Sequence, residues 1–374
     1  QFSFLVSGYT FSAGVFGFLS AFVADRFDRK PLLMFLFTGF ILGTVTCSLA
    51  PSYGILLAAR ILTGAFGGIL SAMVFAVVGD AVPIERRGTA MGWVTAAFSA
   101  ASVFGVPFGL FLASKISWHA PFVFLACLGM PVWVMAWRYI PNTAQPESTR
   151  ENPLQLLQRV SLDRNQQWAL LLIILMMLGQ FSVIPFLSPS MVANVGFSEG
   201  NLAYIYLLGG FTTLFTGPWI GRLADRYGRL RVLSTFLLLS IVPTIWITHL
   251  GPAPMLMVLA LTTSFFVVSG GRMIPVMAMM TAAVAPRYRG SFMSLQSAVQ
   301  QISAGMASLL AGWIIVENSQ GQLLHYPIVG YLAAVTSVLC LFVARRIKVI
   351  DPVGPPLSAQ GESLPEGELQ PVQA

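Results

Sequence analysis

The chain of 374 residues is 56% hydrophobic and only 9% charged, with a formal net charge of +7. A soluble domain of average composition carries about 25% charged residues, so this composition excludes a soluble globular protein. The sequence also lacks the weakly alternating segments of roughly ten residues that are typical of membrane β-barrels. We therefore expect an all-α polytopic membrane protein.

Apolar runs follow one another along the chain, and a membrane-spanning helix needs about 20 such residues. We expect eleven spans, at residues 2–24, 32–50, 53–79, 89–112, 119–139, 167–189, 200–222, 231–249, 253–284, 288–314 and 326–345. The polar segment 141–165 is expected to be a cytoplasmic linker between two helical halves, 1–140 and 166–348. The tail 349–374 is rich in Pro, Gly, Ser and Glu and is expected to be disordered.

Basic residues indicate which side of the membrane each turn faces. All but three of the 21 Lys and Arg residues fall in clusters at 26–30, 86–87, 138–164, 222–231, 287–289 and 345–348. Basic loops stay in the cytoplasm, so we expect a multi-pass protein of the bacterial inner (plasma) membrane with a cytoplasmic C-terminus. This distribution explains the positive charge without a nucleic-acid partner. The scattered Cys47, Cys127 and Cys340 indicate small buried side chains, and we expect no metal or cofactor.

An odd number of spans is unexpected for a duplicated bundle. Counting back from a cytoplasmic C-terminus places Gln1 outside, and only 24 residues precede Asp25. The corresponding stretch before Asp225 is longer by about one helix, so we expect twelve spans in the complete protein, the first of them upstream of Gln1. A true eleven-span protein with an external N-terminus and a cleaved signal peptide are the alternatives.

Two similar charged hairpins indicate the duplication. Residues 23–29 read Val-Ala-Asp-Arg-Phe-Asp-Arg, and residues 223–229 read Leu-Ala-Asp-Arg-Tyr-Gly-Arg. Each hairpin joins two apolar runs, so the pair predicts a repeated helical bundle. Gly228 can adopt a positive φ in such a turn, and Asp28 tolerates a positive φ better than most residues do.

The segment 221–229, Gly-Arg-Leu-Ala-Asp-Arg-Tyr-Gly-Arg, resembles the signature loop of the major facilitator superfamily, which joins the second and third helices of each half. In the first copy, Ala21 and Asp28 stand where the family usually has glycine. The resemblance implies two six-helix bundles, related by a pseudo-twofold axis, that rock about a central cavity in alternating access. It also implies a conformational latch at the hairpins, to which we assign Asp25, Arg26, Arg29, Asp80, Asp225, Arg226, Gly228 and Arg229.

Asp80 ends the third expected span. In the family an acid at this position forms a charge relay with the hairpin Asp and Arg, so the resemblance implies a latch of Asp25, Arg29 and Asp80. The corresponding region of the second half, 282–290, contains no acid. The latch with an acid is therefore expected in one half only.

Arg60 lies inside the third expected span and precedes Gly64 by four residues. This pattern resembles the helix-four motif of the family, which is linked to proton transfer. An arginine within a span costs roughly 2.5–3.5 kcal/mol, so a functional role is the default hypothesis. The alternative is a side chain that extends to the outer interface.

The fourth expected span contains Gly105, Pro107 and Gly109. It resembles the glycine- and proline-rich helix-five signature of proton-driven exporters, although in that signature a glycine directly precedes the proline. We interpret these residues as a hinge, because small residues and a proline allow bending and close packing.

Two further groups of polar residues lie within spans of the second half. Arg272 follows Ser269 near the middle of an apolar run, so we expect it to face an aqueous cavity or a carboxylate and to contact substrate or a coupling residue. Gln296, Gln300 and Ser303 share one helical face and predict either a cavity wall or hydrogen bonds between helices.

These features together predict a secondary active transporter, most similar to the drug and sugar efflux branch, that exports a small molecule by proton antiport. We expect a monomer in the lipid bilayer and no enzymatic activity, because no clustered His, Asp or Cys constellation is present in the sequence. Apart from Asp80 the visible spans contain no acid, so the carrier carboxylate is expected in the absent first helix. The alternative is an uptake symporter or facilitated exchanger for a small anionic metabolite, which Arg60 and Arg272 would recognise.

Overall fold

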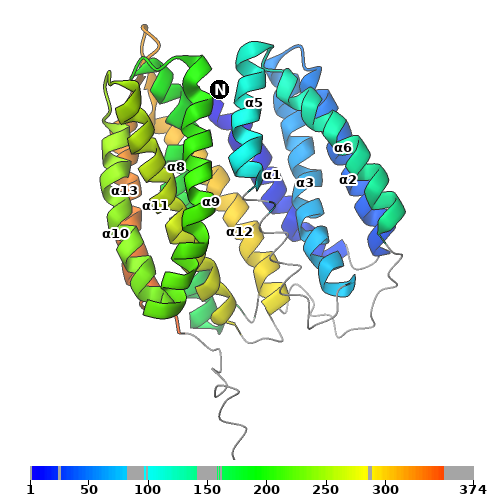
Figure 1. The fold of residues 1–374 in the computed structure, drawn as a ribbon. Coiled ribbons are helices and arrows are strands. Elements are labelled where there is room, and N and C mark those ends of the chain that lie inside the picture. The colour runs from blue at the N-terminus through cyan, green and yellow to red at the C-terminus, as the bar shows by residue number, and fades with distance from the viewer. Residues whose placement is uncertain are drawn as a thin grey trace, which may run out of the picture.

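The computed structural model describes residues 2–23, 27–81, 100–140, 162–284 and 289–348, together with the single residues 97, 158 and 160. Two groups of helices stand side by side, and they come from the two halves of the chain (Figure 1). The first group comprises α1 (Phe2–Val23), α2 (Arg29–Ser48), α3 (Tyr53–Ala81), the π-helix η2 (Ala101–Gly105), α5 (Val106–Lys115) and α6 (Ala120–Tyr139). The second comprises α8 (Arg164–Ala193), the short 3-10 helix η3 (Glu199–Asn201), α9 (Leu202–Tyr227), α10 (Arg229–Thr248), α11 (Met255–Ala282), α12 (Arg289–Ile314) and α13 (Tyr326–Ala344).

The expected spans coincide with helices to within a few residues, except that the span at 89–112 is described as a helix only from Ala100 onward. In the described part of the chain, eight helices are long and apolar enough to cross a membrane. The linker was expected to end at residue 165, but α8 already begins at Arg164. The reason is a helix cap, because the Asp163 carboxylate accepts hydrogen bonds from the backbone N–H groups of Asn165 and Gln166.

The same packing pattern occurs in both halves. In the first half α1 packs on α3, α2 packs on α3, and α2 packs on α6. In the second half α9 packs on α11, α10 packs on α11, and α10 packs on α13. Each pair of the first half corresponds to a pair of the second in the same chain order. The described helices therefore form two bundles related by a pseudo-twofold axis, as the repeated hairpins predicted.

One helix of the second half has no described counterpart in the first. Helix α8 packs against α12 and α13, the helices that correspond to α5 and α6. Within the described residues no helix covers α5 and α6 in this way, and Ala126 is the one buried residue of α6, whereas α13 buries nine. The expectation of a further helix before Gln1 stays a prediction.

The two halves meet along two seams. Helix α1 packs along α12, and the segment η2–α5 packs along α9. These are corresponding pairs under the pseudo-twofold axis, since α1 and α9 occupy equivalent places, as do α5 and α12. In Figure 1, α1 and α12 cross the middle of the molecule between the two groups. Any cavity shared by the halves must lie beside these seams.

The all-α expectation misses one small feature. Strands β1 (Val316–Glu317) and β2 (Leu323–Leu324) pair antiparallel in the turn between α12 and α13. The Asn318 side chain accepts hydrogen bonds from the backbone N–H groups of Gln320 and Gln322, which closes the turn. A two-residue pairing is set by this local turn and does not change the fold class.

Candidate functional site

Glycines bring α1 and α12 into backbone contact. A Cβ atom added to Gly14 would lie 3.0 Å from the carbonyl oxygen of Ala298, and one added to Gly305 would lie 3.3 Å from the backbone nitrogen of Phe11. A Cβ on Gly312 would collide with the Ser3 side chain near the start of α1. The seam therefore has no room for larger side chains at these three depths.

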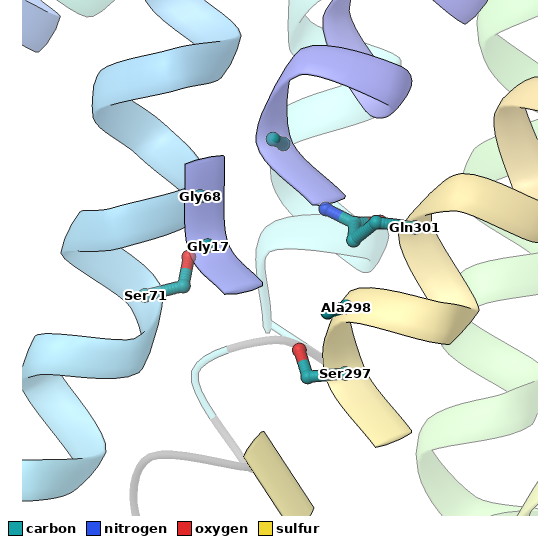
Figure 2. Close-up of a pocket in the computed structure, with 7 residues that line it drawn as sticks. Gly17, Gly68, Ser71, Ser297, Ala298 and Gln301 are labelled. Atoms are coloured by element: carbon teal, nitrogen blue, oxygen red, sulfur yellow. The ribbon is translucent and has the colours of Figure 1, made fainter. Parts of the chain in front are cut away.

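A small cavity of about 20 Å³ lies beside this seam. Its lining comes from both halves: Ala13 and Gly17 of α1, Gly68 and Ser71 of α3, and Ser297, Ala298 and Gln301 of α12. Figure 2 shows the Ser297 and Gln301 side chains extending from α12 toward α1 and α3. None of the lining residues that the structure describes is charged. None of these seven residues was predicted as a site residue, and the small size of all but Gln301 at helical spacing was the available signal.

Arg272 does not face this cavity. Its side chain is only 4% exposed and lies within the second half. The guanidinium donates hydrogen bonds to the hydroxyl oxygens of Ser337 on α13 (3.1 Å), Ser240 on α10 (3.2 Å) and, more weakly, Ser269 on α11 (3.4 Å). The expectations of an aqueous environment and of a carboxylate partner are not met in the described part of the chain. The serine cluster could not be found from spacing within one helix, because it joins three helices.

Arg60 is directed toward α1. Its guanidinium carbon lies 4.5 Å from the centre of the Tyr9 ring, in a cation–π arrangement. The glycines of the helix-four pattern hold Tyr9 in place, because a Cβ on Gly64 would meet the backbone of Tyr9 and one on Gly67 would lie 2.9 Å from its hydroxyl. The motif residues Arg60 and Gly64 thus both contact Tyr9, which was not predicted as a site residue.

Gln296 and Gln300 bind each other. The Gln296 amide nitrogen donates to the side-chain oxygen of Gln300 at 3.0 Å and lies 3.9 Å from the sulfur of Met277 on α11. Gln296 is buried, so the pair contributes to contacts inside the second half. Of the two interpretations of this polar face, the contacts favour packing between helices over a cavity wall.

The second hairpin has the conformation expected at Gly228, whose φ is +92°. After this turn Arg229 donates a hydrogen bond to the carbonyl oxygen of Ala278 at 3.1 Å, which ties the hairpin to the end of α11. Asp225 and Arg226 are exposed, and the Arg226 guanidinium lies 5.4 Å from the centre of the Tyr227 ring. The second half thus joins its hairpin to α11 through the backbone carbonyl of Ala278, because residues 282–290 contain no acid that could pair with Arg229.

The first hairpin is only partly described. Asp25 and Arg26 lie outside the described residues, as do the side chains of Arg29 and Asp80. Asp28 has a φ of −58° and precedes α2. Asp28, which would tolerate a positive φ better than most residues, does not adopt one, and this turn uses an extended residue where the second uses glycine. The latch of the first half stays a prediction.

The hinge residues lie at a change of helix type. Residues Ala101–Gly105 form a π-helix, and α5 follows with Pro107 in its first turn. Proline has no N–H to donate and its ring crowds the preceding turn, which accounts for the widened helix. Pro107 is buried, whereas a Cβ on Gly105 or Gly109 would meet no atom within 4 Å. The segment packs against α9, at the second seam.

Two repeated bundles of apolar helices, joined along two seams with a small cavity beside one of them, define a polytopic membrane protein. The comparison of sequences specifies the class further. The chain belongs to the Major Facilitator Superfamily, whose sequence model matches residues 1–180 and again residues 169–372.

Relatives support this assignment over most of the chain. The uncharacterized MFS-type transporter YbcL of Bacillus subtilis is 25% identical over 318 residues, which is 84% of this chain and 80% of the relative. The uncharacterized MFS-type transporter YtbD of the same organism is 27% identical over 345 residues, which is 89% of this chain and 82% of the relative. The efflux pump dotC of Dothistroma septosporum is 33% identical over 97 residues, 26% of this chain and 17% of the relative. The protein is thus a multi-pass membrane transporter and not an enzyme.

Proposed function

We propose that this protein is a secondary active exporter that moves a small molecule out of the cytoplasm in exchange for protons. The observation that carries the proposal is the cavity between the halves, because its lining combines residues of α1 and α3 with residues of α12. A solute bound there contacts both bundles, so its binding responds to any rocking of one bundle against the other.

The direction of transport rests on two weaker observations. Pro107 follows a π-helix at the seam with α9, in the segment whose glycines and proline resemble the helix-five signature of exporters. One relative that matches a quarter of the chain is named an efflux pump. Both observations support export over uptake.

Proton coupling is assigned to the surroundings of Arg60. The guanidinium lies over Tyr9 near the outer end of α3, within the pattern that resembles the proton-transfer motif of the family. The guanidinium of Arg60 would hold a neighbouring proton-carrying carboxylate ionised until the bundles rearrange.

The alternative, recognition of an anionic metabolite by Arg60 and Arg272, has less support. Arg272 is enclosed by three serines inside the second half, and Arg60 lies over a tyrosine ring. Neither residue belongs to the lining of the cavity between the halves.

Inverted membrane vesicles test the proposal. ATP acidifies their lumen, and the quenching of a pH-sensitive acridine dye reports the gradient. Addition of a transported solute to the outer medium is expected to restore fluorescence, because the solute enters as protons leave. Vesicles that lack the protein serve as the control. Proton-coupled accumulation in right-side-out vesicles, without dequenching in inverted ones, would show uptake by symport and contradict the proposal.

A further inference from the structure

We propose that the exposed faces of α10 and α13 bind an anionic phospholipid, whose headgroup contacts Arg231, Arg345 and Arg346 on the side of the hairpins. These three residues are called the basic rim. The proposal concerns the second half alone, so it does not depend on the substrate or the direction of transport. It is carried by the arrangement of the two helices, the charge of the rim and the apolar side chains beside it.

Helices α10 and α13 lie side by side and run in opposite directions (Figure 1). Where α10 ends, the Nε2 atom of His249 lies 3.0 Å from the hydroxyl oxygen of Tyr331 near the start of α13. Counted from this contact, a rise of about 1.5 Å per residue brings Arg231 and Arg346 to within about one helical turn of the same depth. The start of α10 and the end of α13 therefore present their arginines at one level.

The side chains of the basic rim are exposed, and they form no ion pair or hydrogen bond with the residues that the structure describes. Their places in the fold are nevertheless fixed. Arg231 lies in the first turn of α10, and Ile347, directly after the rim, is buried in the core of the second half. Three arginines held at one level without a described countercharge suit a phosphate group, which a guanidinium can bind through two hydrogen bonds.

An exposed apolar face continues from the rim along each helix. On α10, Leu238 and Val242 follow Arg231 at helical spacing and are 53% and 63% exposed. On α13, Phe342 lies one turn before the rim arginines and is 61% exposed. The headgroups of a bilayer lie directly beside its hydrocarbon core, so a lipid whose chains cover these faces places its phosphate at the level of the rim. A molecule with both a charged headgroup and acyl chains therefore fits this surface.

The charge of the rim selects an anionic lipid over a zwitterionic one. A zwitterionic headgroup carries a cation beside its phosphate, and the arginines repel that cation. Each basic residue near the membrane surface contributes about a fivefold preference for anionic lipid. The first half lacks the same arrangement, because the alignment of the two hairpins puts Pro31 where the second half has Arg231.

A fluorescent reporter beside the rim tests the proposal in a bilayer. The whole protein carries Phe342→Cys in a Cys127→Ser background and is labelled with bimane; Cys47 and Cys340 are buried. It is reconstituted in phosphatidylcholine that contains a small fraction of phosphatidylglycerol or phosphatidylcholine with brominated acyl chains, which quench bimane on contact. We expect the brominated phosphatidylglycerol to associate about tenfold or more strongly than the brominated phosphatidylcholine.

A second reporter, Val134→Cys on α6, is the matched control. Val134 is 53% exposed and precedes Arg138 by four residues, as Phe342 precedes Arg346. Replacement of all three rim arginines by glutamine should abolish the lipid preference at residue 342 and leave the quenching at residue 134 unchanged. Replacement by lysine should retain a preference of several-fold, because it keeps the charge. An unchanged signal at residue 134 also shows that the variant is folded.

Four outcomes would overturn the proposal. Two are equal quenching by both lipids at residue 342 in the wild type, and a preference there that persists in the glutamine variant. A preference that millimolar glycerol 1-phosphate abolishes would mean that the rim holds a soluble phosphate. A preference that appears only when Asp351, Glu362, Glu366 and Glu368 are changed to their amides would mean that the acidic tail occupies the rim.

Discussion

The hydroxyl groups around Arg272 have hydrogen-bond acceptors of their own. The Ser240 hydroxyl donates to the carbonyl oxygen of Leu237 at 2.7 Å, and the Ser337 hydroxyl donates to that of Ala333 at 2.8 Å. These serines therefore need no arginine to satisfy their protons. The Arg272 Nε atom, in contrast, is buried without a partner among the described residues. The arginine accordingly costs folding energy that the serines recover only in part.

This environment predicts opposite results for two substitutions of Arg272. Arg272→Met fills the same space without a buried charge and should keep the melting temperature at or above that of the wild type. Arg272→Ala leaves a cavity and should cost roughly 2–5 kcal/mol, a loss of several degrees. Fluorescence-detected melting of the purified protein measures both, and the transport rate is recorded in parallel. If a stable Arg272→Met variant lost transport, Arg272 would have a direct role in transport, as the sequence predicted.

Arg60 and Tyr9 form a pair that can be tested by a double-mutant cycle. A cation–π contact with a partly buried arginine stabilises by about 0.5–2 kcal/mol, so Tyr9→Leu should lower the melting temperature and Tyr9→Phe should not. In an Arg60→Met background Tyr9→Leu should cost less, because the contact is already lost. Strictly additive changes in melting temperature would mean that the two side chains do not interact.

At the scale of elements, the seam between α1 and α12 depends on glycine. A Cβ on Gly305 would lie 2.8 Å from the Thr10 hydroxyl oxygen and 3.1 Å from the Phe11 ring. Any side chain at this position must push the two helices apart. This part of the seam lies near the middle of α1, which runs from Phe2 to Val23.

We therefore expect Gly305→Leu to separate α1 from α12 along this seam. Ser3, which is buried against α12 nearer the start of α1, is replaced by cysteine as the reporter in a Cys127→Ser background. Its labelling by an impermeant maleimide should increase at least tenfold in Gly305→Leu, while transport decreases. Gly54→Leu is the control, since a Cβ on Gly54 meets no atom within 4 Å. Equal labelling in both variants would show that the seam tolerates the added bulk.

The helices and their order could be predicted from the sequence because a spanning helix needs a long apolar run, which is a local property. The direction of a side chain within a span could not. Arg272 lies in an apolar run whose faces differ little in polarity, so nothing local indicated that it points toward α10 and α13. The cavity was missed for a related reason: Ser71 and Gln301 are more than two hundred residues apart and meet only when the halves are assembled.

At the scale of the whole molecule, the second half is fastened as a unit on the side of the hairpins. The Asn165 side chain donates to the carbonyl oxygens of Ala283 and Lys348 and accepts from the backbone N–H of Lys348 at 2.7 Å. One residue at the start of α8 thereby joins the ends of α11 and α13. Such a connection suits a bundle that moves as a rigid body against its partner across the two seams.

The sidedness of the hairpins follows from the number of crossings between them. The chain crosses the membrane along α2, α3, the η2–α5 segment, α6, α8 and α9 between the first hairpin and the second. An even number of crossings returns the chain to the side from which it started, and from the basic residues of both hairpins we propose that this side is the cytoplasm.

Single cysteines in a background that lacks the native exposed thiol of Cys127 test this arrangement. Phe27 and Tyr227 are 52% and 51% exposed, so Phe27→Cys and Tyr227→Cys should both react with an impermeant maleimide in inverted vesicles and not in right-side-out vesicles. Trp118→Cys and Gln320→Cys, at exposed positions on the opposite side, should show the reverse. Labelling of the two hairpins from opposite sides would be incompatible with two bundles of like orientation. The shared cavity would then lose the paired bundles that alternating access requires.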